Sequence, residues 1–238
     1  MVKFCLIGGK INKEVLSNNI EKYLYQKTNK EKPTVLFCPY ASKNIKKTTL
    51  RFHELVKNIN FNIIDLDFNN INQFDELLNQ SDILYISGGV SDDLVDIFKK
   101  YNLDKILLKY INQDKIYAGV SAGAMLYTKI SMGDKYMYST GFKTYGYKMV
   151  ECLDIIDISI CPHYQNPDLI FYNDEIKKYN LVSFGIEEDS ALFIEDNKYY
   201  VLKEEGNVAV YQFLPKKDYL MEDLKRGVVY DQTFTIRS

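Results

Sequence analysis

The stretch Ile116-Tyr117-Ala118-Gly119-Val120-Ser121-Ala122-Gly123-Ala124-Met125 organises this chain. A short apolar run ends at a serine that has one glycine two positions before it and another two positions after it. In this spacing the serine sits on a sharp turn from a strand into a helix, which lifts its hydroxyl clear of the sheet. The N–H of the next residue points toward the same space and can stabilise an oxyanion. A tight strand–helix turn that happens to hold a serine fits this pattern equally well.

Strands and helices alternate through the first half of the chain. The hydrophobic periodicity predicts strands at 2–7, 34–37, 61–66, 83–86 and 116–120, and helices at 11–25, 48–59, 71–78, 91–98 (with Ser91 as N-cap) and 103–111. Such alternation with short loops predicts an α/β fold, with a mainly parallel sheet and helices on both faces. Ligands of these sheets bind beyond the carboxyl ends of the strands. Because Gly88, Gly89 and Ser121 all lie at predicted carboxyl ends, we expect them to face one crevice.

The pattern changes after residue 128. Residues 131–148 are rich in Gly, Tyr, Ser and Thr, which predicts loops or a β-ribbon instead of a crossover helix. Further predictions are strands at 155–160, 181–185, 191–194, 199–202 and 208–213, a helix at 167–178, and a helix with an edge strand in the tail, 218–238. Repeats, linkers and low-complexity tracts are absent from the sequence, so we expect residues 1–238 to form a single domain.

Composition excludes several classes of protein. The 238 residues are 46% hydrophobic, enough for a sizeable core, and 30 basic and 32 acidic residues leave a net charge of −2. This balance predicts neither a nucleic-acid nor a membrane partner. Four cysteines without a C-x-x-C pair are typical of reduced, buried thiols. Since no apolar run approaches membrane-spanning length and the chain starts directly in a strand, we expect a cytoplasmic protein.

A serine nucleophile needs a base, and the chain has two histidines. His53 lies inside a predicted amphipathic helix, where a surface or packing histidine is expected. His163 directly follows Pro162 and an apolar strand, so it lies at a strand carboxyl end of its own. This placement predicts that His163 is the base, and a satisfied structural histidine is the alternative.

The third member of a triad is a carboxylate that orients the base. Glu187 and Glu188 end a predicted strand, and adjacent residues on a strand point to opposite faces, so only one of them can face His163. Asp134, in a loop thirteen positions after Ser121, is a competing candidate. A run of acids such as Glu187 to Asp189 is also typical of a solvated turn.

Two other patterns carry weaker signals. Gly8-Gly9-Lys10 follows the first strand but lacks the spacing of a phosphate-binding loop, so close strand–helix packing is the preferred interpretation. Cys161 lies next but one to His163 but not at an elbow, and with so few histidines no zinc site is expected.

Four motifs in order resemble one family. Gly119-Val120-Ser121-Ala122-Gly123-Ala124, preceded by Gly88-Gly89 and followed by Pro162-His163-Tyr164, resembles the dipeptidase E and cyanophycinase family of serine peptidases. Gly185-Ile186-Glu187-Glu188-Asp189-Ser190-Ala191 is similar to a further segment of that family. The resemblance covers nearly the whole chain. It implies the class I glutamine-amidotransferase-like α/β fold, a flavodoxin-like three-layer sandwich, with serine where the amidotransferases carry cysteine.

The resemblance also implies roles for individual residues. Ser121 corresponds to the nucleophile, His163 to the general base, and Gly89 and Ala122 to the donors of the oxyanion hole. Glu188 matches the third triad residue of the cyanophycinase-like members. Asp134 corresponds loosely to an aspartate described in other members, and together with Glu187 it stays an alternative. No metal and no organic cofactor is implied.

Two departures from the family pattern concern the substrate. Val90 stands where many relatives have Asn or Asp after the two glycines, so one polar contact is missing. Members that cleave after an N-terminal aspartate use an arginine some way after the histidine, but this chain has none between His163 and Gly185, only Lys177 and Lys178. Lysine supplies a point charge instead of a bidentate fork. This argues against an aspartyl preference, and the substrate side chain stays unassigned.

The sequence therefore predicts a dipeptidase E-like serine peptidase that hydrolyses a small peptide or amide through a Ser-His-Glu triad and an acyl-enzyme. The alternatives are an esterase or isopeptide hydrolase built on the same elbow, and a non-catalytic member that binds a small molecule. We expect a monomer or a homodimer.

Overall fold

The computed structural model of the chain describes residues 2–10, 17–133, 147–167, 171–204, 208–215 and 220–237. Its strands are β1 (Lys3–Ile7), β2 (Thr34–Cys38), β3 (Asn62–Asp65), β4 (Ile83–Ile86), β5 (Ile116–Val120), β6 (Thr128–Gly133), β7 (Lys148–Glu151), β8 (Ile156–Pro162), β9 (Ser183–Ile186), β10 (Ser190–Glu195), β11 (Lys198–Lys203), β12 (Val210–Leu214), β13 (Leu220–Leu224) and β14 (Tyr230–Asp231). Its helices are α1 (Asn19–Lys27), α2 (Ile45–Val56), α3 (Phe74–Gln80), α4 (Ser91–Lys100), α5 (Leu103–Tyr110), α6 (Ala122–Met125) and α8 (Tyr172–Glu175), with 3-10 turns η1 (Ile71–Gln73) and η3 (Ile176–Tyr179).

The strands described form two mixed sheets instead of the one mainly parallel sheet that the sequence predicts. The first sheet has the order β14-β11-β10-β1-β5-β4-β2-β3, and the second has the order β13-β12-β9-β8-β6-β7. The run from β1 to β3 is parallel, whereas β10 and β11 pair antiparallel. The two residues between β10 and β11, Asp196 and Asn197, have φ values of 55° and 59°, which makes a tight hairpin and leaves no room for a crossover helix. The α/β class is confirmed, and the single parallel sheet is wrong.

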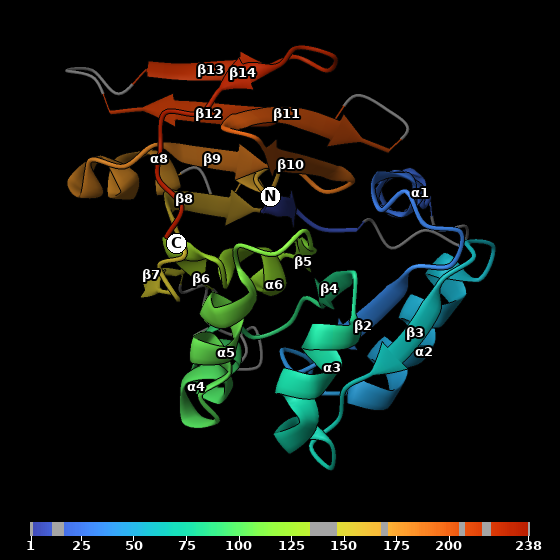
Figure 1. The fold of residues 1–238 in the computed structure, drawn as a ribbon. Helices are drawn as coiled ribbons and strands as arrows, with labels where there is room; N and C mark the ends of the chain where they lie inside the picture. The colour runs from blue at the N-terminus through green and yellow to red at the C-terminus, as the bar shows by residue number, and fades with distance from the viewer. Residues whose placement is uncertain are drawn as a thin grey trace.

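Helices cover both faces of the first sheet, as predicted. Along β1 the buried side chains alternate: Cys5 and Ile7 pack in a core with α1 and α2, whereas Phe4 and Leu6 pack in a second core with α3 to α6 and the second sheet. Figure 1 accordingly shows α4 and α5 at the opposite side of the molecule from α1 and α2. The central strands are therefore buried on both faces, and their carboxyl ends carry the site.

All four cysteines are free and buried, which confirms the expected reduced thiols. Burial raises the pKa of each thiol. Cys161 lies in a small aromatic core, and its sulfur contacts the carbonyl of Pro162 instead of His163. None of the helices in the described ranges is long and apolar enough to cross a membrane.

Some predicted elements differ from those in the structure. The helix predicted at 48–59 is α2, which starts earlier because the side chain of Asn44 accepts a hydrogen bond from Lys47 N at 3.0 Å and caps it. The helix predicted at 11–25 starts only at Asn19, as α1, because Asn18 has non-helical dihedral angles, with a φ of −133°. Residues 11–16 lie outside the described ranges. Ser91 is the first residue of α4 and not its N-cap. Val90 takes the cap position with extended dihedral angles, and its N–H donates to Ala41 O at 2.8 Å.

The second half also departs from prediction in places. β6 and β7 pair antiparallel, so the ribbon expected at 131–148 is present where the structure describes it, and residues 134–146 lie outside the described ranges. The helix predicted at 167–178 is described from Tyr172 as α8 followed by η3, and residues 168–170 lie outside the described ranges. The tail helix is wrong for residues 220–237, where β13 pairs with β12 and β14 pairs with β11. The extended tail forms backbone hydrogen bonds with β11 and β12. A surface helix in its place would leave the outer backbone groups of these two strands unpaired.

Candidate active site

Ser121 occupies a strained turn between β5 and α6. Its φ of 51° and ψ of −113° lie outside the regions that L-residues prefer, as at a nucleophile elbow. The flanking glycines allow this turn: a Cβ on Gly119 would lie 2.3 Å from Gly123 C, and a Cβ on Gly123 would lie 2.3 Å from Ile86 O. Contacts this short exclude any side chain at either position. The backbone therefore holds the serine at the edge of the sheet.

His163 lies between Ser121 and Glu188. The distance from His163 Nε2 to Ser121 Oγ is 2.8 Å, and the distance from His163 Nδ1 to Glu188 Oε1 is 2.7 Å. His163 directly follows β8 with a φ of 54°, and its N–H donates to Gly8 O at 3.1 Å. The hydrogen bond with His163 holds the pKa of Glu188 below its ordinary value, although burial opposes this. Serine, imidazole and carboxylate thus form one chain of hydrogen bonds.

The other candidates lie elsewhere. Glu187 Oε2 accepts a hydrogen bond from Ala209 N at 2.7 Å, so Glu187 faces the second sheet while its neighbour Glu188 faces His163. Asp134 lies outside the described residues. His53 pairs with Asp65 on the surface of α2, with 2.9 Å between Nε2 and Oδ2, and it does not line the cleft beside Ser121. Sequence reasoning thus separated the two histidines and left the two glutamates to be separated by structure.

The loop after β4 runs beside Ser121. A Cβ on Gly88 would lie 3.3 Å from Ser121 Cβ, and a Cβ on Gly89 would lie 1.9 Å from Ala41 O. Gly89 has a φ of 152°, so only glycine fits this close approach. Ala122 is the first residue of α6, where backbone N–H groups have no partner within the helix. Gly89 and Ala122 therefore lie on the two segments that flank Ser121, and their role as oxyanion donors stays a prediction.

Gly8 and Gly9 belong to the site, which sequence reasoning missed. A Cβ on Gly9 would lie 2.6 Å from His163 Cε1 and 2.8 Å from Glu188 Cγ. A Cβ on Gly8 would lie 2.3 Å from Ile186 O. The interpretation as strand–helix packing is therefore wrong, because both glycines pack against the segments that carry the histidine and the glutamate. Their position at the carboxyl end of a strand, like that of Ser121, was the available signal.

A cleft of about 510 Å³ opens beside Ser121 and His163. Its walls include the aromatic rings of Phe37, Phe52 and Tyr85. A further wall is basic and comes from α2 and the loop before it, with Lys43, Lys47 and Arg51. No aspartate or glutamate is among the described residues that line the cleft. The described lining of the cleft is therefore partly apolar and carries basic side chains, which are suited to an anionic group.

The basic groups come from a part of the chain that sequence reasoning did not consider. Lys177 and Lys178, the basic residues that follow His163, pair with Asp174 and Glu175 at 2.8 Å and 2.6 Å, and neither lines the cleft. α2 precedes Ser121 by some seventy positions, and no local pattern connects the two.

The described part of the chain holds no group of three or more His, Cys, Asp or Glu residues that could bind a metal ion.

Known peptidases are similar to this chain over most of its length. Residues 4–202 match the model of peptidase family S51. The uncharacterized peptidase YgaJ of Bacillus subtilis (strain 168) is 23% identical over 218 residues, which cover 87% of this chain and 89% of YgaJ. Peptidase E of Haemophilus influenzae (strain PittGG) is 24% identical over 185 residues, which cover 72% of this chain and 75% of that protein.

Solved structures agree on the fold. The crystal structure of a peptidase from an acI-B1 Actinobacterium matches with a TM-score of 0.71 at 20% identity and covers 97% of both chains. The structure of a putative peptidase E protein from Listeria monocytogenes EGD-e matches with a TM-score of 0.64 at 20% identity, over 86% of this chain and all of that one. The chain therefore shares its overall fold with these proteins.

Proposed function

Because the chain belongs to peptidase family S51, and is thus a peptidase E-like serine peptidase, we propose that it hydrolyses a small peptide through Ser121, His163 and Glu188. Ser121 Oγ attacks the carbonyl carbon while His163 Nε2 takes its proton. His163 then gives this proton to the leaving amine, and an acyl-enzyme remains on Ser121. Water hydrolyses the acyl-enzyme by the same route. The observation that carries the proposal is the continuous hydrogen-bond chain of 2.8 Å and 2.7 Å.

Glu188 and the backbone complete the mechanism. The carboxylate of Glu188 accepts the Nδ1–H of His163, which leaves Nε2 unprotonated and directed at Ser121, and it stabilises the imidazolium that forms. The N–H groups of Gly89 and Ala122 receive the oxyanion, a contribution of about 3 kcal/mol per donor. The proposed scaffold is a single domain over residues 1–238 with the class I glutamine-amidotransferase-like fold. The elbow at the end of β5 and the helices on both faces of the first sheet support this assignment.

The test of this function is covalent labelling with a fluorophosphonate probe, which reacts with activated serines. We expect one probe per chain, attached to Ser121, as located by peptide mass mapping. Labelling should disappear in the His163→Gln variant, because the serine then lacks its base, and should persist in His53→Gln, the matched control on the surface of α2. A folded wild-type protein that takes up no probe would favour the non-catalytic alternative.

A substrate panel then separates the peptidase from its closest alternatives. Dipeptides, isopeptides and p-nitrophenyl esters all suit the same elbow, and kcat/KM ranks them. We expect dipeptides to lead over isopeptides, because the chain belongs to a family of peptidases. Isopeptides with a higher kcat/KM than any dipeptide would transfer the proposal to an isopeptide hydrolase, and ester hydrolysis without turnover of any dipeptide would transfer it to an esterase.

The basic wall of the cleft leads to a prediction about KM. We propose that Lys47 and Arg51 attract a carboxylate of the substrate. The Lys47→Gln/Arg51→Gln double variant is expected to raise KM about tenfold for a dipeptide with a free C-terminal carboxylate, since hydrogen bonds to charged groups are worth about 1.5 kcal/mol or more. The kcat should stay unchanged, because the wall contributes no proton transfer.

Two comparisons isolate this effect. The same dipeptide with an amidated C-terminus should show little change in KM between wild type and double variant. Lys46→Gln is the matched control, because Lys46 is exposed on α2 but does not line the cleft. An equal rise in KM for the acid and the amide would contradict a role in carboxylate binding.

A further inference from the structure

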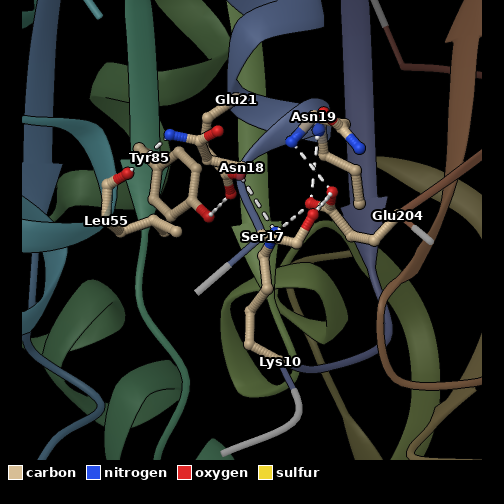
Figure 2. Close-up of polar contacts among 9 residues, drawn as sticks. Lys10, Ser17, Asn18, Asn19, Glu21, Leu55, Tyr85 and Glu204 are labelled. Atoms are coloured by element: carbon tan, nitrogen blue, oxygen red, sulfur yellow. Dashed lines mark hydrogen bonds and ion pairs between the residues drawn. The ribbon is translucent and has the colours of Figure 1, made fainter. Parts of the chain in front are cut away.

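Lys10, Glu21 and Glu204 form a largely buried cluster of charged side chains (Figure 2). Lys10 is also one of the residues that line the cleft. Lys10 Nζ is 2.6 Å from Glu204 Oε1 and 3.0 Å from Glu21 Oε2. Glu21 and Glu204 are only 1% and 2% exposed, and the side chain of Lys10 is 12% exposed. Two buried carboxylates thus share one ammonium group. Burial of charges is unfavourable unless every group is paired, so each of these charged atoms should have a hydrogen-bond partner.

Every oxygen of the two carboxylates accepts at least one hydrogen bond. Glu204 Oε2 accepts from Ser17 Oγ at 2.6 Å and from Asn19 N at 2.8 Å, so Glu204 caps the N-terminus of α1 from a distant part of the chain. Figure 2 shows Tyr85 directed at Glu21, and its hydroxyl donates to Oε1 at 2.8 Å. Burial opposes ionisation of both Lys10 and Glu204. Their mutual attraction outweighs it, raising the pKa of Lys10 and lowering that of Glu204.

The cluster is joined to the site through residues 8 to 10. Gly9 packs against His163 and Glu188 so closely that a Cβ there would clash with both side chains, and Lys10 is the next residue. Gly8 O accepts from His163 N, and Gly9 O accepts from Asp189 N at 2.9 Å. Asp189 O in turn accepts from Glu204 N at 2.8 Å. A closed ring of bonds therefore runs from Lys10 through Glu204 and Asp189 back to Gly9, beside the His163–Glu188 pair.

We propose that Lys10, anchored by Glu21 and Glu204, is a positioning residue for His163 and Glu188. The ion cluster holds the backbone of residues 8 to 10 in place, and this backbone is the wall on which the imidazole and the carboxylate lie. Without the anchor, the wall moves and His163 Nε2 loses its direction toward Ser121. The inference rests on the proposed function for its kinetic part, and its structural part can be tested without turnover.

The kinetic test uses Lys10→Met, which removes the charge and keeps much of the side-chain volume. We expect kcat to fall about 100-fold, the size of effect that a small misplacement of catalytic groups produces. Lys10→Arg should restore part of the loss because it keeps the charge. Lys27→Met is the matched control, since it removes the ion pair with Glu195 at the other end of α1 and should leave kcat unchanged. Rates are normalised to the folded fraction.

The second readout is NMR of the imidazole rings. With two histidines in the chain, selective ¹⁵N-histidine labelling shows two rings, and His53→Gln assigns them. We expect a downfield Nδ1–H proton of His163 in the wild type and its loss in Lys10→Met. Absence of turnover by a wild type that shows this proton would overturn the proposed function and leave the positioning role standing.

A variant in which the cluster carries no charge keeps the test possible if Lys10→Met is unstable. If Lys10→Met does not fold, Lys10→Met/Glu21→Gln/Glu204→Gln takes its place, because it leaves no unpaired buried charge and such replacements are often tolerated. Loss of kcat and of the His163 proton in either folded variant supports the proposal. Wild-type kcat together with an unchanged His163 proton in either one overturns it.

Discussion

Replacement of Ser121 by alanine is expected to lower kcat for dipeptide hydrolysis about 10⁶-fold. The hydroxyl is the only group removed, and without it no acyl-enzyme forms. Its Oγ lies 2.8 Å from His163 Nε2, at hydrogen-bond distance from the proposed base. The residual rate should come from the oxyanion donors and from substrate binding alone.

The fold should survive this change. Alanine and serine meet the same backbone strain at a φ of 51°, so we expect Tm to shift little. Initial rates on the best dipeptide of the panel and a thermal melt measure both effects. Ser81→Ala is the control, because Ser81 is a buried serine whose hydroxyl bonds Leu78 O at 2.9 Å, away from the cleft. Turnover by Ser121→Ala within about tenfold of wild type would exclude a serine nucleophile at this position.

Replacement of Glu188 by glutamine is expected to lower kcat about 10⁴-fold, by analogy with carboxylate-to-amide changes in other triads. The amide either donates to His163 Nδ1 or accepts from it only weakly, so the tautomer with a free Nε2 is lost. KM should change little because Glu188 does not line the cleft. The measurement is kcat and KM on the same dipeptide.

Glu187→Gln provides the matched control, one residue away in the same turn. Glu187 accepts from Ala209 N and touches neither His163 nor Ser121, so kcat should stay near the wild-type value. The cost is expected in stability, at about 1 kcal/mol for a weakened hydrogen bond. The opposite result, with Glu187→Gln inactive and Glu188→Gln active, would exchange the two assignments.

The lowered pKa of Glu188 also sets the sign of a pH effect. A carboxyl whose pKa lies below its ordinary 4.5 in the folded state stays ionised throughout the neutral range, and its contribution to stability is lost only as pH falls below that value. Above about pH 5, protonation of Glu188 therefore does not contribute to a loss of kcat/KM.

Some features of this protein depend on residues adjacent in the sequence, and others depend on residues far apart in the chain. The elbow follows from a few adjacent residues: two glycines around Ser121 are needed because their backbones touch neighbouring strands and turns. The prediction of His163 as the base follows from its position directly after an apolar strand. Alternation of strands and helices predicted the α/β class but not the second sheet, because the sequence pattern of a strand does not specify which sheet it joins.

The remaining features depend on contacts between residues far apart in the chain. Which of Glu187 and Glu188 faces His163 is set by the twist of a turn held by Gly9 and Ala209. The basic wall comes from α2, and the buried anchor of Lys10 comes from Glu21 and Glu204. Residue spacing encodes periodicity and backbone freedom, so the sequence was sufficient to predict the turn at Ser121, to propose Ser121 and His163 as nucleophile and base, and to give the fold class. Charge pairing and cleft lining are set by distances across the folded core, so these features followed from the tertiary structure.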